Sequence, residues 1–192
     1  MRITFLVALL LTSSIMAAPD QGVRAFLGIR SAGMTLTKVN HGITYVYALA
    51  RLEKGRFIKF EQLSNGSLLA QRDATFELLW GKNNGQSGFA FVAGTASREF
   101  KADTTFEKLS FESRQAQGEY ATTISMAPEY KGMKVLTGAF SQSPKDPILL
   151  LNPSAKIDEL LADVDCAILV LFKECRTVKD SLDFLRGLKS SK

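Results

Sequence analysis

The sequence predicts an α+β protein that is mainly antiparallel β: a meander of eight or nine strands, forming a barrel-like or strongly curved sheet, with a C-terminal helical segment packed on it. Two observations carry this prediction. Short runs of β-branched and aromatic residues, separated by turn-forming residues, follow one another over 33–141. After two prolines, the pattern changes to apolar residues at alternating spacings of four and three.

Length and composition indicate one globular domain. The chain has 192 residues, of which 46% are hydrophobic and 22% are charged, and this balance excludes a disordered chain. Two cysteines are too few for a small disulfide-rich scaffold. We expect four segments, the last two forming one domain: a signal peptide (1–17), a lead-in (18–32), the antiparallel β region (33–141), and a proline-containing loop with an amphipathic helix (142–192).

The N-terminus has the pattern of a cleaved secretory signal peptide. Arg2 supplies a positive charge, and residues 3–11 form an apolar run that is followed by small residues. Cleavage is expected after Ala17, because cleavage after Ala18 would leave Pro19 as the first mature residue. The apolar run is too short to span a bilayer, so we expect a secreted or periplasmic protein without a membrane anchor.

The strands are predicted from the placement of apolar side chains. The run 43–49 is rich in β-branched and aromatic residues and is apolar on both faces, which predicts a central strand. Residues 56–63, 74–80 and 120–126 alternate between apolar and polar positions, which predicts half-buried strands. Turn-forming residues separate these runs at 40–42, 53–56, 64–67 and 82–85.

The C-terminal pattern predicts helix. Asn152 followed by Pro153 is a typical helix start, and Gly187 is a typical stop. Apolar residues recur between them at helical spacing: Ile157, Leu161, Val164, Ile168, Leu171, Cys175, Val178, Leu182 and Leu185. The periodicity does not decide between one long helix and two helices joined near 163–165. The all-round apolar stretch 167–172 favours packing on the chain's own sheet over a coiled-coil seam, so a monomer is expected.

Cys166 and Cys175 are the two cysteines, and an exported chain usually pairs its cysteines. In one continuous helix, nine residues of rise would separate them by about 13.5 Å, beyond the roughly 7 Å over which a disulfide forms. Three alternatives stay open: a bridge with a break in the helix, two free thiols, or intermolecular pairing. A bridge would exclude the single long helix.

The sequence contains few candidate residues and motifs for catalysis. His41 is the only histidine, and it lies in an Asn-His-Gly turn without a companion at metal-ligand spacing, so we expect a turn residue. A triad of His41, Asp73 and Ser87 lacks the sequence surroundings of known nucleophiles. The sequence also contains no phosphate loop and no zinc-protease motif. We therefore expect no enzyme, cofactor or metal site, and an unrecognised hydrolase is the remaining catalytic alternative.

Basic residues gather around the turn at 53–56: Arg51, Lys54, Arg56 and Lys59. This patch fits an anionic envelope or membrane surface, or it is only a solvated hairpin tip that discourages strand pairing. Nucleic acid is not expected as a partner of an exported chain. Asn65-Gly66-Ser67 matches a glycosylation acceptor pattern, and the same Asn-Gly pair is typical of a hairpin turn.

The leading functional hypothesis is an exported β-rich binding module that carries a small apolar or lipid-like ligand. In a barrel, one face of each strand looks into an interior that side chains either fill or leave open. An open interior would be lined by Tyr45, Tyr47, Phe76, Leu78, Trp80, Phe89 and Phe91. The alternatives are an ordinary filled core and a non-catalytic structural or interaction protein of the cell envelope or extracellular space.

Overall fold

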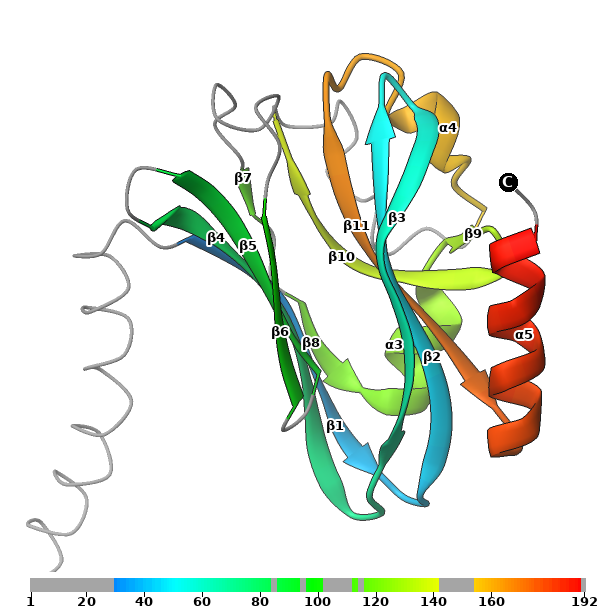
Figure 1. Ribbon diagram of the computed structural model, residues 1–192. Helices are drawn as coiled ribbons and strands as arrows, with labels where there is room; N and C mark the ends of the chain where they lie inside the picture. Colours follow the sequence, from blue (N-terminus) through cyan, green and yellow to red (C-terminus); the bar gives the residue numbers. More distant parts are fainter. Residues whose placement is uncertain are drawn as a thin grey trace, which may run out of the picture.

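The computed structural model describes residues 30–83, 86–93, 96–101, 112–113, 116–141 and 154–190 (Figure 1). It confirms an α+β fold that is mainly antiparallel β, with a curled half-barrel of strands and a C-terminal helix packed on it. The strands are β1 (Arg30–Val39), β2 (Ile43–Glu53), β3 (Arg56–Leu68), β4 (Arg72–Asn83), β5 (Gln86–Ala93), β6 (Ala96–Lys101), β7 (Glu112–Ser113), β8 (Ala116–Glu119), β9 (Glu129–Tyr130), β10 (Met133–Phe140) and β11 (Ala167–Cys175). The helices are α3 (Tyr120–Met126), α4 (Ile157–Leu160) and α5 (Val178–Ser190). The predicted signal peptide lies outside the described residues.

The strands form two sheets. The first sheet has the order β6-β5-β4-β1-β8, and the second has the order β3-β2-β11-β10-β7, with β9 beside β10. The pairs are antiparallel except β1 with β8, which run parallel. The described residues contain eleven strands rather than eight or nine, partly because β7 and β9 have only two residues each. The simple meander is also interrupted, because β11 lies between β2 and β10.

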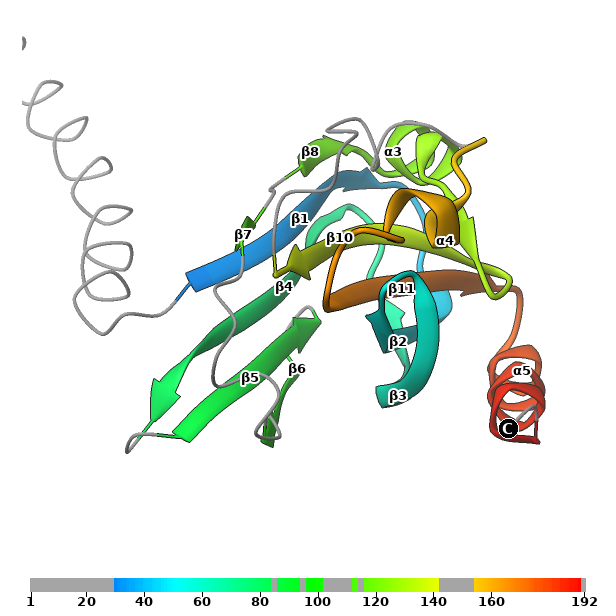
Figure 2. The same cartoon turned by 90° about the horizontal axis from the view of Figure 1, so that it is seen from above.

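Two apolar cores hold the layers together. Figure 2 shows the sheets close together at β1 and β10 and diverging toward β6 and β3. The faces that look at each other enclose the inner core, which takes buried side chains from both sheets. The opposite face of the second sheet forms the outer core with α4 and α5. The second sheet is thus buried on both faces, which requires strands that are apolar on both faces.

Strand β2 confirms the prediction of a central strand. It pairs with β3 on one side and with β11 on the other. Because successive side chains alternate between faces, Tyr45 and Tyr47 enter the inner core, whereas Val46 and Ala48 enter the outer core. All four of these residues are buried.

The predicted turn at Asn65-Gly66 is wrong, because both residues lie inside β3. Gly66 is paired with Tyr45, and a Cβ atom on Gly66 would lie 2.6 Å from the Tyr45 hydroxyl, so the glycine makes room for this ring. Asn65 points to the other face, where its Nδ2 donates to Ser181 Oγ of α5 at 3.2 Å. A glycan on that nitrogen would therefore displace the helix. The chain reverses between β4 and β5 as predicted, with Asn83 opposite Gln86.

The helix predicted across 157–185 is wrong in its central part, where the chain forms β11. Ile168 and Val170 contribute to the inner core, while Leu169 and Leu171 contribute to the outer core. An unbroken apolar run satisfies the helical spacing and a strand buried on both faces equally well. The segment forms a strand because β2 and β10 supply hydrogen-bond partners on both of its sides.

The strand predicted at 120–126 is also wrong, because these residues form α3. The side-chain hydroxyl of Ser125 donates to the Thr122 carbonyl at 2.8 Å, a local bond that suits a helical turn. Ile124 packs against the inner core, whereas Met126 is exposed. Pro128 is the second residue after the helix, and a proline at this place does not continue a helix.

The C-terminal helix α5 begins with a capping box. Thr177 Oγ1 accepts from the Asp180 backbone N–H at 3.1 Å, and Asp180 Oδ2 accepts from the Thr177 backbone N–H at 3.0 Å. The predicted stop at Gly187 is wrong, since the helix continues to Ser190. The predicted start at 152–153 lies outside the described residues. Within the described ranges, the helices are too short to cross a membrane.

Candidate functional site

Aromatic side chains from four strands gather in the inner core. Tyr45 of β2 stacks on Phe172 of β11 with ring centroids 5.3 Å apart, and it meets Phe76 of β4 edge-on at 5.7 Å. Tyr47 of β2 lies against Phe91 of β5, with centroids 5.0 Å apart. These rings join the two sheets, and each such pair adds about 0.5–1.5 kcal/mol beyond the burial of area. We call these five residues the aromatic cluster.

The structure brings most of the predicted lining residues together. Tyr45, Tyr47, Phe76, Leu78, Trp80 and Phe91 all belong to the inner core. The side chain of Phe89 lies outside the described part. Each of the six is at most 8% exposed, so each also serves as a core residue. The sequence did not identify Phe172 as a lining residue, because the apolar spacing around it predicted a helix and not the strand β11.

A polar wall on β3 borders the aromatic cluster. The strand register pairs Gln62 with Leu49 and Ser64 with Tyr47, which places both polar residues on the inner face. Gln62 Nε2 donates to the Tyr47 hydroxyl at 3.3 Å. The other amide atom, Gln62 Oε1, is buried, and no donor in the described part of the chain bonds to it. A buried hydrogen-bond acceptor therefore lies beside the aromatic cluster.

Arg51 is buried, contrary to the prediction that it lies in a surface patch. Its residue exposure is 4%, and its guanidinium forms ion pairs with Glu53 Oε1 at 2.5 Å and with Glu61 Oε1 at 3.8 Å. Glu61 is the extra residue of a bulge in β3, between Phe60 and Gln62, and a bulge is able to redirect a side chain in this way. The two carboxylates compensate the charge that Arg51 brings into the protein.

The other three residues of the predicted basic patch lie at the surface. Lys54 and Arg56 are exposed at the turn between β2 and β3, and Lys59 Nζ lies 3.0 Å from Glu61 Oε2. The Lys54 backbone N–H donates to the Val164 carbonyl at 3.0 Å, which ties this turn to the segment after α4. The basic surface is therefore smaller than predicted, because one cation is buried and another is paired with an acid.

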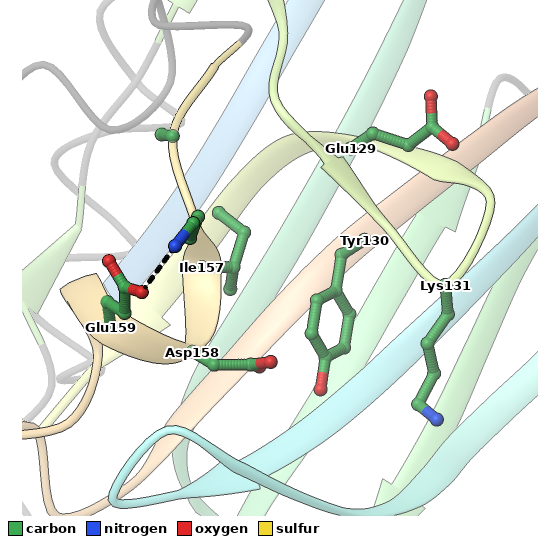
Figure 3. A pocket seen from close by; sticks show the side chains of 8 residues that line it. Glu129, Tyr130, Lys131, Ile157, Asp158 and Glu159 are labelled. Carbon is green, nitrogen blue, oxygen red and sulfur yellow. Dashed lines mark hydrogen bonds and ion pairs between the residues drawn. The ribbon is translucent and has the colours of Figure 1, made fainter.

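A cleft lies on the outer side of the second sheet, between the β9–β10 turn and α4 (Figure 3). We call it the outer cleft. Its volume is about 440 Å³, and its lining is formed by Glu129, Tyr130, Lys131, Ala155, Lys156, Ile157, Asp158 and Glu159. The charges along it have both signs, and Lys156 pairs with Glu159 at 2.8 Å. No sequence pattern points to this cleft, because its residues come from segments far apart in the chain.

Tyr130 and Asp158 lie next to each other in the outer cleft (Figure 3). Burial raises the pKa of Tyr130 well above its usual range, and the negative charge of Asp158 and a hydrogen bond with that residue raise it further. Tyr130 therefore keeps its proton at neutral pH, and its interaction with the Asp158 carboxylate links β9 to α4. Nearby, Lys131 Nζ lies 4.0 Å from the centre of the Phe57 ring. We interpret these contacts as structural, because they hold β9 and the following turn against α4 and β3.

Neither cysteine forms a disulfide, and both are buried. Cys166 belongs to the inner core and Cys175 to the outer core. An extended segment of nine residues separates them by roughly 30 Å, far beyond the reach of a disulfide. Of the three alternatives, the structure favours two free thiols. Burial raises the pKa of the Cys175 thiol, which lowers its reactivity further.

The residues considered for catalysis do not come together. His41 is exposed in the turn between β1 and β2, and Asp73 Oδ1 accepts from the Lys38 backbone N–H at 3.4 Å. Ser87 pairs with Lys82, which lies roughly 30 Å from Asp73 along β4. The described residues contain no group of three or more His, Cys, Asp or Glu side chains arranged to hold a metal ion.

No protein-family model, no curated protein and no solved structure matches this chain.

Proposed function

We propose that this protein is an exported, non-catalytic binding module that holds a small apolar or lipid-like molecule between its two sheets. One observation supports this proposal most strongly: aromatic rings from both sheets meet in one cluster on the faces between them. Rings clustered in this way supply apolar contacts of defined geometry, and the linings of small-molecule sites are rich in such aromatic side chains.

The proposed site is the side of the inner core on which the sheets diverge. On this side, the contact between Tyr47 of β2 and Phe91 of β5 joins the two sheets. Beyond this contact lies β3, the outer strand of the second sheet, whose inner face carries the half-buried residues Gln62, Ser64 and Gly66. A ligand would rest on the two rings and against this wall.

Trp80 provides a reporter for this proposal. It is the only tryptophan of the chain and belongs to the inner core. We expect the neutral apolar probe diphenylhexatriene to bind and to receive energy transfer from Trp80. Native mass spectrometry of protein purified gently from its source should also show a reproducible bound mass. A clean polypeptide mass together with no energy transfer would contradict the proposal.

A matched pair of variants locates the site. Ser64→Phe fills the inner side of β3 next to Tyr47, so we expect it to weaken probe binding at least tenfold. Ser67→Phe places the same side chain at an exposed position on the other face of the same strand, and it should leave binding unchanged. Equal effects of the two substitutions would contradict this location.

Export is part of the proposal and has its own test. The pattern of residues 1–17 supports removal of a signal peptide. We expect N-terminal sequencing of the protein from its source to begin at Ala18. An N-terminus at Met1 would contradict export through this signal.

The alternative function, an envelope or extracellular interaction protein, has one specific observation in its favour. Val178 and Leu182 lie one turn apart on α5 and are 57% and 41% exposed. A dimer in size-exclusion chromatography that Leu182→Asp dissociates would support this alternative. A monomer in both proteins would leave the binding module as the better account.

A further inference from the structure

Resting on the proposed function, we infer that the ligand is amphipathic and carries a hydrogen-bond donor, such as an alcohol group, that binds the buried side-chain oxygen of Gln62.

The first observation is that only one of the two amide atoms of Gln62 has a hydrogen-bond partner among the described residues. Its Nε2 is occupied by the Tyr47 hydroxyl, at 3.3 Å. Its Oε1 is buried, and no donor of the described residues reaches it. A buried acceptor without a donor lowers stability, because it has lost its hydrogen bonds to water. A ligand hydroxyl placed there would restore the missing bond.

The position of this oxygen supplies the second argument. Gln62 lies on the inner face of β3 and bonds to Tyr47, whose ring contacts Phe91. A ligand on the aromatic cluster would therefore have its apolar part on these rings and its polar end at Gln62. One end of the site is polar and the rest is apolar, which is the complement of an amphipathic molecule.

The charges around Gln62 supply the third argument, which concerns the kind of polar group. Glu61 is the next residue along the strand, is largely buried, and lies 3.8 Å from Arg51, which also pairs with Glu53. Arg51 is thus neutralised by two carboxylates. Lys59 in turn pairs with Glu61 at 3.0 Å, so two cations and two carboxylates balance one another here. A carboxylate on the ligand would bring an unbalanced charge to the Gln62 acceptor and could not donate to it, whereas a hydroxyl would satisfy this acceptor.

Competition against diphenylhexatriene tests the inference. The competitors are dodecanol, dodecyl methyl ether and dodecanoate, which share the same apolar chain. We expect the alcohol to displace the probe roughly tenfold more strongly than the ether, the change that one satisfied hydrogen bond produces. Dodecanoate should compete less well than the alcohol at neutral pH.

Variants of Gln62 test whether its side-chain oxygen is the group that accepts the hydrogen bond from the ligand. Gln62→Met keeps the length of the side chain but removes the acceptor, so the ratio of alcohol to ether should fall to about one. Gln62→Glu keeps an acceptor and should preserve the preference for the alcohol. Circular dichroism of each variant checks that the fold is intact.

The outcomes separate the inference from the proposed function. If diphenylhexatriene binds but the alcohol and the ether compete equally with wild-type protein, the inference is wrong and the binding module stands. If the probe does not bind at all, the proposed function is wrong and the inference falls with it. The wild-type comparison decides the matter even if Gln62→Met does not fold.

Discussion

At the scale of single residues, Gly55 shows how one position ties two distant segments together. It lies in the turn between β2 and β3 with a φ of +74°, a conformation that L side chains rarely adopt. A Cβ atom at this position would overlap the backbone carbonyl oxygen of Asp158 in α4. The turn is therefore packed directly against the helix that borders the outer cleft.

We expect Gly55→Ala to lower the free energy of unfolding by about 2–4 kcal/mol, because the backbone strain and the overlap add. Gly187→Ala is the matched control, since nothing lies within 4 Å of the added Cβ in the interior of α5. The control should raise the free energy of unfolding by about 0.5–1 kcal/mol. Urea unfolding measures both, and a similar small effect for the two variants would contradict the packing described here.

Tyr130 makes a prediction about alkaline pH. Its pKa is raised in the folded protein by burial and by Asp158, so the unfolded chain loses this proton first, at about pH 10. The stabilisation by Tyr130 is thus fully present below about pH 10 and is lost as the pH rises above it.

Tyr130→Phe should lower the free energy of unfolding by about 1 kcal/mol near neutral pH and make its fall at alkaline pH shallower. Urea unfolding between about pH 8 and about pH 11 measures the change. Part of the fall should remain in the variant, because burial also raises the pKa of Tyr45. An Asp158→Asn double-mutant cycle provides the control, since additive losses would show that the two residues do not interact.

At the scale of elements, β11 is the strand on which both cores depend. Leu171 is fully buried and packs into the outer core from the middle of the second sheet. We expect Leu171→Asp to prevent folding, because an unpaired buried carboxylate costs an amount comparable to the whole stability of a domain, about 5–15 kcal/mol.

The comparison for Leu171→Asp is Leu182→Asp, a substitution at an exposed position of α5. It should change the free energy of unfolding by less than about 1 kcal/mol. Far-UV circular dichroism and thermal unfolding measure the two variants. A folded Leu171→Asp protein would show that β11 does not lie between two cores.

The same strand predicts the behaviour of the thiols. Cys166 directly precedes β11 and Cys175 is its last residue; both are buried, Cys166 in the inner core and Cys175 in the outer core. We expect reductant to leave the thermal midpoint unchanged, and Ellman's reagent to detect two thiols only after unfolding. A midpoint that falls with reductant would indicate a bridge and contradict this placement.

At the scale of the whole molecule, the second sheet is shared between the inner and outer cores. Loss of either core exposes one face of this sheet, so neither layer is expected to unfold separately. We therefore expect a single cooperative transition in urea.

Two probes are available for this transition. Trp80 fluorescence reports the inner core, and far-UV circular dichroism reports the elements of both layers, including α5. The two transitions should coincide. Separate midpoints would show that the helical layer unfolds independently of the sheets.

The sequence by itself determined the elements whose pattern has only one solution. The alternation of Ala74, Phe76, Leu78 and Trp80 is incompatible with a helix that buries one face, and β4 buries these four residues as predicted. The two-faced apolar run of β2 identified a central strand and, with it, the tyrosines of the aromatic cluster. These features depend only on the spacing of apolar side chains along the strand, and residues close together in the sequence determine that spacing.

Only the tertiary structure decided the places where local patterns are ambiguous. The run 167–172 suits a buried helix or a buried strand, and the partners β2 and β10 make it a strand. Asn65-Gly66 suits a turn, but Tyr45 covers the glycine and α5 binds the asparagine. Gln62 joins the candidate site only through its register with β2. In each case the deciding partner is distant in sequence, so hydrogen bonding and packing between remote segments outweigh local preference.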